Sequence, residues 1–223
     1  MVSTTSQLIE FTWRSNYLPL HADPMFLVAD PPEPLATDDF VLAPLRPELL
    51  DLDTEAYLAS PDVIRDHSCG RWPLEGFGSD DNLPLVIRHW SDHQAKRAFT
   101  YLFLDPEGTS SLGCLYVQPL FPYLEAMGAD AQTLLRYAGG STARVSYWLR
   151  QDREPGLTAS IAERLDEWLR TKWPLDAYLY RAAPAEECTV HALDRLPVDR
   201  VVIDLPAEQH DYLWWAADVR IVS

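Results

Sequence analysis

The stretch from residue 147 to residue 169, YWLRQDREPGLTASIAERLDEWL, determines how the rest of the chain is interpreted. It begins as a β-strand, and from Leu157 onward its apolar residues recur at helical spacing, which predicts a helix over 157–172. Gly156 lies at the junction, three residues after Arg153. Because the first amides of a helix lack intrahelical partners and carry partial positive charge, this junction is suited to bind an anion.

Length and composition indicate a globular protein with a sizeable core. The chain has 223 residues, of which 47% are hydrophobic, and eight of them are tryptophans. Its formal net charge is -16, and an acidic surface repels phosphate backbones and anionic lipid, so we expect no nucleic-acid and no membrane partner. The sequence has no long apolar run and no basic, then apolar, amino terminus, and we expect a cytoplasmic protein.

The cysteines and histidines give no clear metal motif. Cys69, Cys114 and Cys188 are widely spaced, without a paired CxxC unit, and are interpreted as reduced thiols, with Cys188 a small buried residue. His89 and His93 have the i, i+4 spacing that a metal site can use, but no third ligand is evident. We therefore interpret both histidines as solvated residues of a helix face and expect no metal.

The domain organisation predicted from the pattern is one body preceded by an arm. Residues 1–38 are rich in proline and acid and keep neither helical nor strand spacing, so they are predicted to pack on the body as an N-terminal arm, and residues 39–223 to form a single domain. The predicted order is a strand in 40–48, a helix over 48–65 that is interrupted near Pro61, a helix over 83–98 with Asp81 or Asn82 as its cap, a hairpin in 99–120, an insertion over 120–143 with a helix at 131–137, a strand over 143–150, the helix over 157–172, a strand over 176–183, a helix in 184–196 and two strands in 199–205 and 211–222.

This order resembles the Gcn5-related N-acetyltransferase (GNAT) superfamily over roughly residues 39–222. The sequence segments LGCLYVQP (112–119) and ARVSYWLR (143–150) are similar to the third and fourth strands of an uncharacterised bacterial branch of that family. The resemblance implies a mixed α/β (α+β) fold, in which helices flank a central twisted, mostly antiparallel sheet.

The resemblance also implies acetyl-CoA as co-substrate, without a metal. The family's Q/R-x-x-G-x-G/A loop matches residues 153–158, so Arg153, Gly156, Leu157 and Thr158 are implied to hold the diphosphate. Thr158 replaces the family's glycine or alanine, and Pro155 removes one amide donor, which would weaken binding.

The family's fourth strand separates from its neighbour and exposes backbone groups. By resemblance, the backbone near Trp148, Leu149 and Arg150 would pair with the amide-bearing arm of CoA. Arg150 is implied either to contact a phosphate or to be a solvated charge at the strand end.

Catalytic and acceptor residues are less well defined. By resemblance, Leu193 takes the place of a tyrosine that acts as the general acid in many family members, which leaves the catalytic residues unknown. His191 is a candidate for this role, because imidazole titrates near neutrality. His67 and Trp72 lie in a loop that borders the acceptor pocket in the family, where Trp72 either walls the pocket or pins the loop. Tyr116 faces either the acceptor cleft or the opposite layer.

The function implied by the resemblance is acyl-CoA-dependent N-acyl transfer, most simply N-acetyl transfer, to a small-molecule amine that attacks the thioester directly. The negative net charge of the protein would attract a cationic amine by electrostatic steering and so favour it as the acceptor. The alternative is a non-catalytic binding or interaction protein that has the same fold and a degenerate CoA site. A homodimer is left open.

Overall fold

The structure, a computed structural model, describes residues 26–27, 29–73, 75–138, 140–151, 153–154 and 156–218. Within these residues seven strands form one sheet in the order β1-β2-β3-β4-β5-β7-β6. Every neighbouring pair is antiparallel except β4 and β5, which are parallel. The predicted α/β fold with a mostly antiparallel sheet is therefore confirmed.

The elements follow one another in nearly the predicted order. The strands are β1 (Val41–Pro44), β2 (Phe99–Leu104), β3 (Ser111–Pro119), β4 (Thr142–Leu149), β5 (Ala177–Ala182), β6 (Asp199–Val201) and β7 (Leu213–Asp218). The helices are η2 (Pro47–Leu49), α2 (Leu50–Ala59), α3 (Pro61–His67), α4 (Ser79–Gln94), α5 (Phe121–Ala126), α6 (Ala131–Tyr137), α7 (Leu157–Lys172) and α8 (Glu187–Leu193).

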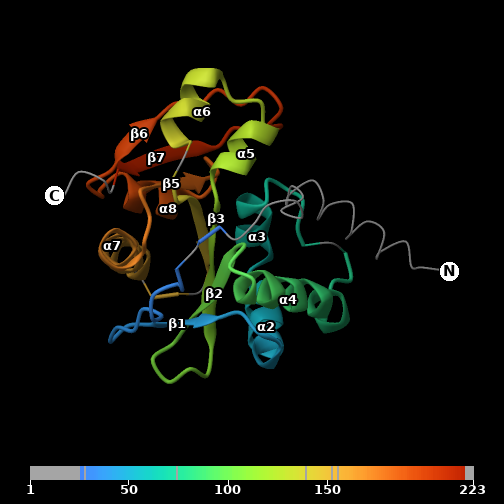
Figure 1. Cartoon of the computed structure of the whole chain (residues 1–223). Helices are drawn as coiled ribbons and strands as arrows, with labels where there is room; N and C mark the ends of the chain where they lie inside the picture. Colours follow the sequence, from blue (N-terminus) through green and yellow to red (C-terminus); the bar gives the residue numbers. More distant parts are fainter. Residues whose placement is uncertain are drawn as a thin grey trace.

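Helices cover both faces of the sheet (Figure 1). Helices α7 and α8 pack on one face over a large apolar cluster, and α2, α3 and α4 cover the other face over a second cluster. Because side chains alternate along a strand, β4 sends Tyr147 to the first cluster and Trp148 to the second. The candidate site lies on the α2–α4 side.

Helix α7 has the predicted bounds and the predicted buried stripe. Ile161, Leu165 and Trp168 are all buried in the cluster that it shares with the sheet. The Trp168 indole N–H also donates to the Glu33 carbonyl at 3.2 Å, and Leu27 is buried in the same cluster, so the described part of the arm contacts the body. Residues 1–25 and residue 28 of the expected arm lie outside the described residues.

Helix α4 begins four residues earlier than predicted. The sequence placed its start at Leu83 behind an Asp81 or Asn82 cap, but the helix begins at Ser79 with Gly78 as the N-cap residue. The Gly78 amide donates to the Asp81 carboxylate at 3.2 Å. Asp81 therefore accepts from the N-cap backbone as the third residue of the helix, and is not itself the cap. Asn82 is buried instead of capping the helix.

The 120–143 insertion contains two helices, of which only α6 was predicted. Helix α5 carries Pro122 in its first turn, a position that proline tolerates well. Tyr123 and Leu124 of α5 are buried in a third apolar cluster with Trp214 of β7. The insertion is therefore packed against the β5–β7 end of the sheet.

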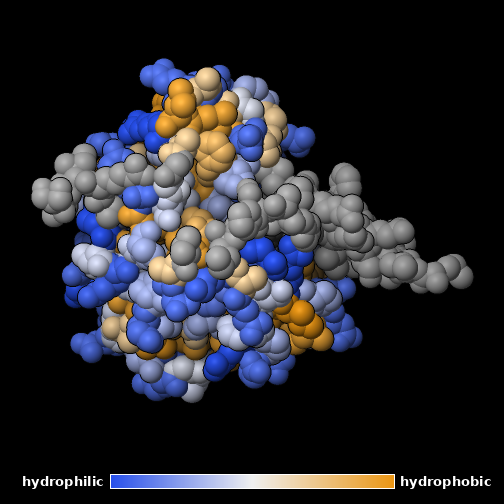
Figure 2. Space-filling model, in the orientation of Figure 1, coloured by the Kyte–Doolittle hydropathy of each residue, from blue (hydrophilic) through white to orange (hydrophobic). Residues whose placement is uncertain are grey.

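The visible surface is mostly hydrophilic, with an apolar patch where α5 and α6 lie (Figure 2). Leu135 of α6 is 77% exposed. Within the described residues, no helix combines the length and the apolar character that a membrane span requires.

His93 contradicts its interpretation as a solvated residue, because its ring faces the sheet. The ring lies edge-on to Phe99 and Tyr101, with centroids 5.1 and 5.4 Å away, and its Nδ1 is buried. Burial lowers the pKa of His93 to about 4. Between about pH 6.5 and pH 4 the unfolded chain therefore binds a proton that the folded chain excludes.

Replacing His93 by phenylalanine should consequently flatten the acid dependence of stability. The free energy of unfolding of the wild type should fall more than that of the variant as the pH drops from 6.5 to 4.5, because the variant lacks this group. Urea unfolding of both proteins at the two pH values measures the difference. Equal losses would contradict the assignment.

Candidate functional site

The sheet opens between its two parallel strands. The register of β4 with β5 ends at Val145 opposite Tyr180. Beyond that pair, β4 continues against β3 as far as Leu149, and β5 continues against β7 as far as Ala182. The last four residues of β4 thus have β3 as their registered neighbour, and the side toward β5 is open.

The backbone of β4 presents alternate residues to this opening. The Arg150 amide donates to the Leu112 carbonyl at 2.8 Å, so its backbone is turned toward β3. In an antiparallel pair the hydrogen-bonding groups of successive residues point to opposite sides, so Tyr147 and Leu149 face the opening, whereas Trp148 faces β3. Of the three residues expected to meet a ligand through their backbone, Leu149 alone is oriented toward the opening.

The start of α7 lies directly after this open edge. Gly156 is the N-cap residue and has φ of 88°, a left-handed conformation that favours glycine, and nothing lies within 4 Å of the position its Cβ would take. Arg153 is folded across the turn, where its Nε donates to the Thr158 hydroxyl at 2.7 Å and its Nη1 to the Arg150 carbonyl at 2.8 Å. Thr158 therefore supports the arginine that precedes the helix.

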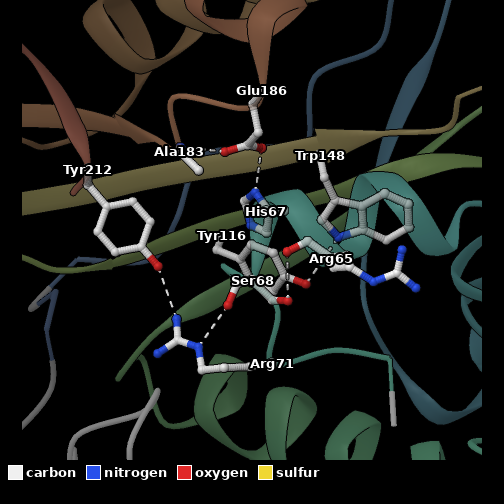
Figure 3. A network of polar contacts seen from close by, with 9 residues as sticks. All are labelled: Arg65, His67, Ser68, Arg71, Tyr116, Trp148, Ala183, Glu186 and Tyr212. Atoms are coloured by element: carbon white, nitrogen blue, oxygen red, sulfur yellow. Dashed lines mark hydrogen bonds and ion pairs between the residues drawn. The ribbon is translucent and has the colours of Figure 1, made fainter. Parts of the chain in front are cut away.

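A cavity of about 250 Å³ lies on the α2–α4 side of the sheet. Trp72 and Tyr116, both expected on the acceptor side, line it together with Trp148. The Trp148 indole N–H donates to the Tyr116 hydroxyl at 3.4 Å (Figure 3). The structure thus resolves the two orientations left open for Tyr116 in favour of the cavity side.

A histidine–glutamate pair lies at the wall of this cavity (Figure 3). His67, at the end of α3, lines the cavity, and its Nδ1 is 2.7 Å from the Glu186 carboxylate. The second oxygen of Glu186 accepts the Ala183 amide at 2.6 Å, and only 6% of its side chain is exposed. Because a carboxylate only accepts, Nδ1 carries a proton, and in the neutral form of the ring the lone pair is on Nε2.

Aromatic contacts fix the orientation of the imidazole. The His67 ring stacks on Tyr116 with centroids 6.0 Å apart, and His89 contacts the same tyrosine at 6.0 Å. His89 also lies 3.0 Å from the Thr100 hydroxyl, and burial lowers its pKa to about 4. The interpretation of His89 as a solvated histidine was therefore wrong: it is a neutral residue on the inner face of α4 at pH 7.

A buried carboxyl group also lines the cavity. Asp53 of α2 is 6% exposed and accepts a hydrogen bond from the Asn82 side chain at 2.8 Å. Burial raises the pKa of Asp53 to about 6, and the Asn82 bond opposes the shift. His67 and Asp53 are thus two groups of the lining that have a basic atom able to accept a proton from an amine.

Other residues singled out from the sequence lie elsewhere. His191 is exposed on α8 and does not line the cavity, while Leu193 is buried in the main cluster. Cys188 is exposed, so its interpretation as a buried residue was wrong. The Arg150 guanidinium forms a 2.6 Å ion pair with Glu55.

Three arginines that line the cavity were not singled out from the sequence: Arg71, Arg144 and Arg181. Arg144 and Arg181 lie inside strands that otherwise consist mainly of buried residues. A charged residue in a buried strand is uncommon and needs a partner, which is the signal that could have identified them.

Comparison with known proteins identifies the fold. No protein-family model and no curated protein matches the sequence. Among solved structures, the chain is similar to a probable acetyltransferase at 12% identity, over 82% of this chain and 95% of the other, with a TM-score of 0.59. A putative ribosomal-protein-serine acetyltransferase from Vibrio cholerae matches at 9% identity, over 85% and 99%, with a TM-score of 0.62.

A third similar structure is RimJ from Mycobacterium smegmatis in complex with CoA-disulfide, at 13% identity, over 84% of this chain and 86% of the other, with a TM-score of 0.58. At such identities the likeness concerns the fold. The chain has the fold of the Gcn5-related N-acetyltransferase superfamily.

Proposed function

We propose that this protein is an acyl-CoA-dependent N-acyltransferase that transfers an acetyl group from acetyl-CoA to a small amine. The observation that carries the proposal is the opening between β4 and β5, together with the cavity that β4 and β5 residues line and that His67, held by Glu186, also lines. Similar structures that contain CoA support the choice of donor.

The residues around the opening fit a diphosphate and an amide-bearing chain. The N-terminus of α7 offers backbone amides and the positive end of the helix dipole, and Arg153 adds a cation. The backbone of Tyr147 and Leu149 can pair with amides of an extended ligand, as a neighbouring strand would. The fit does not require a metal.

The chemistry joins an amine nitrogen to the acyl carbon. A neutral amine attacks the thioester carbonyl, the new C–N bond forms, and the C–S bond breaks when the thiolate leaves. His67 Nε2 takes the proton that the nitrogen loses and releases it to solvent, and the thiolate takes up a proton from solvent, so protons balance over the cycle. Glu186 stabilises the imidazolium that forms and holds its tautomer.

The acceptor we propose is a small molecule because the cavity holds about 250 Å³. Several similar structures are instead described as acetyltransferases of ribosomal proteins such as S5 and L7/L12. A protein amino terminus is therefore the second candidate acceptor, and product analysis by mass spectrometry separates the two.

Replacing Gly156 by aspartate should weaken CoA binding about tenfold relative to replacement by asparagine, through charge repulsion at the helix start. Both side chains have the same shape and tolerate the left-handed backbone, so the asparagine variant is the matched control. Titration calorimetry with CoA measures the two affinities. Equal affinities would place the diphosphate elsewhere, and no binding by the wild type at millimolar CoA would exclude the enzyme.

A non-catalytic protein of this fold gives a different result. It would bind CoA or a partner, yet release no thiol from acetyl-CoA in the presence of any amine.

A further inference from the structure

One side of the cavity carries a network of alternating arginines and tyrosines, named here the arginine–tyrosine wall: Arg144, Tyr123, Arg181, Tyr212 and Arg71. All of them except Tyr212 line the cavity, and Tyr212 lies behind the lining, where it contacts Arg181 and Arg71. The Arg144 guanidinium carbon lies 4.0 Å from the Tyr123 ring centroid, and that of Arg181 lies 5.8 Å from Tyr123 and 4.0 Å from Tyr212. Arg71 donates to the Tyr212 hydroxyl at 3.0 Å (Figure 3). Five residues from five separate segments of the chain thus form one connected network of contacts.

The wall concentrates positive charge inside an acidic protein. Its three arginines line the cavity, and the carboxylates that line it with them are Asp53 and Glu208. Glu208 is engaged, because its oxygens accept the Tyr123 hydroxyl at 2.5 Å and the Gln209 amide at 3.0 Å. The wall therefore has more cations than anions.

Two of these arginines differ from other partly covered arginines of the chain. Arg88, Arg97 and Arg170 each form an ion pair with an aspartate at 2.8–3.2 Å. In the described part of the chain, neither Arg71 nor Arg181 has a carboxylate oxygen within 4.0 Å. Their contacts are with tyrosines and, for Arg71, the Ser68 carbonyl at 2.8 Å.

Tyrosine faces and neutral acceptors stabilise a guanidinium less than a carboxylate does. A planar guanidinium binds a carboxylate through two parallel hydrogen bonds, and a hydrogen bond to a charged group contributes about 1.5–3 kcal/mol. A ligand carboxylate in the cavity would supply that partner to Arg181 and Arg71.

The wall lies close to the proposed proton acceptor. Arg71 follows His67 by four residues, and both line the same cavity (Figure 3). A single small molecule in this cavity can therefore present an amine to His67 Nε2 and an anionic group to the wall.

We propose, on the basis of the proposed acyltransferase function, that the acceptor is a small amino-acid-like molecule whose carboxylate binds Arg181 and Arg71 while its amine faces His67. The net charge of the chain favoured a cationic acceptor, but that charge describes the outer surface. The wall has the opposite sign, and it selects an acceptor with an anionic group near its amine.

The test compares acceptors that differ in the carboxylate. L-Alanine, β-alanine and L-glutamate are the carboxylate probes. L-Alaninamide, ethylamine and a short peptide amide that begins with alanine are the matched amines without a free carboxylate. Thiol release from acetyl-CoA gives kcat and KM, and mass spectrometry confirms the product. We expect at least one carboxylate probe to exceed its matched amines about tenfold or more in kcat/KM.

Variants assign that preference to the wall. Arg181→Gln should raise KM for the carboxylate probe about 10- to 100-fold, with a smaller change in kcat and no change in CoA affinity. Arg71→Gln should act in the same direction and serves if the first variant does not fold. Arg65→Gln is the control, because Arg65 pairs with Asp62 on the exposed side of α3 and does not line the cavity.

The outcomes separate the two proposals. If the wild type binds CoA and acetylates amines, but prefers the amides, ethylamine or the peptide, or accepts no carboxylate probe at millimolar concentration, the amino-acid proposal is overturned and the transferase function stands. If unchanged KM values are found for both arginine variants, the wall is not the carboxylate site. If the wild type neither binds CoA nor releases thiol with any probe, both proposals fail.

Discussion

Replacing His67 by asparagine should lower kcat of acetyl transfer ~10²–10⁴-fold, the usual contribution of general acid–base catalysis. Asparagine keeps a polar side chain of similar size at the end of α3 but has no basic nitrogen. The pH dependence of kcat due to imidazole should also disappear, while CoA affinity stays near that of the wild type. Steady-state thiol release across pH, together with CoA calorimetry, measures all three quantities.

Matched variants distinguish this role from loss of packing. Glu186→Gln should give an intermediate loss, because glutamine still reaches Nδ1 but no longer stabilises the imidazolium. His191→Ala should change kcat less than about threefold, since that exposed histidine lies off the cavity. If Asp53→Asn abolishes turnover and His67→Asn does not, Asp53 is the proton acceptor instead.

Of the substitutions proposed for this protein, Gly113→Ala should lower the free energy of unfolding the most. Gly113 in β3 has φ of 147°, and a Cβ there would lie 2.0 Å from the Trp148 carbonyl oxygen and 2.8 Å from the Leu149 Cα. Both atoms are backbone and cannot rotate away. Overpacking and backbone strain each cost about 1–3 kcal/mol, so the free energy of unfolding should fall by roughly 2–6 kcal/mol.

Gly108→Ala is the control for that prediction. Gly108 also has positive φ, 71°, but nothing lies within 4 Å of its Cβ position in the β2–β3 turn. Its replacement should show strain alone, on the order of 1 kcal/mol. Denaturant unfolding compares both variants with the wild type, and a Gly113→Ala loss no larger than that of Gly108→Ala would contradict the clash.

The parts of the fold that local pattern determines were predictable. Helices α6 and α7 have the predicted bounds, because each combines regular apolar spacing with clear end signals. Helix α4 was placed too late since Gly78, which has no side chain to accept a bond, occupies the N-cap. The missed helix α5 owes its stability to packing against β7, which a local pattern does not contain.

The candidate site was predictable only in part, for a similar reason. Tyr116, Trp72 and His67 were expected near an acceptor, and all three line the cavity, although His67 lies at the end of α3 and not in the expected loop. The partner of His67 is Glu186, 119 residues away along the chain, and no spacing rule connects the two. The arginine–tyrosine wall joins segments just as distant, so tertiary packing alone reveals it.

The end of the β4–β5 register at Val145 ties the stability of the empty protein to its affinity for a ligand. A sheet that kept both strands paired to their ends would gain backbone hydrogen bonds and leave no edge for an incoming chain. The fold thus lacks these backbone hydrogen bonds at one place, and a ligand that binds there raises the free energy of unfolding by mass action. We expect selection for heat resistance to favour substitutions that pair β4 with β5 over their full length. Such variants would unfold at a higher temperature but would lose the open edge that the ligand needs.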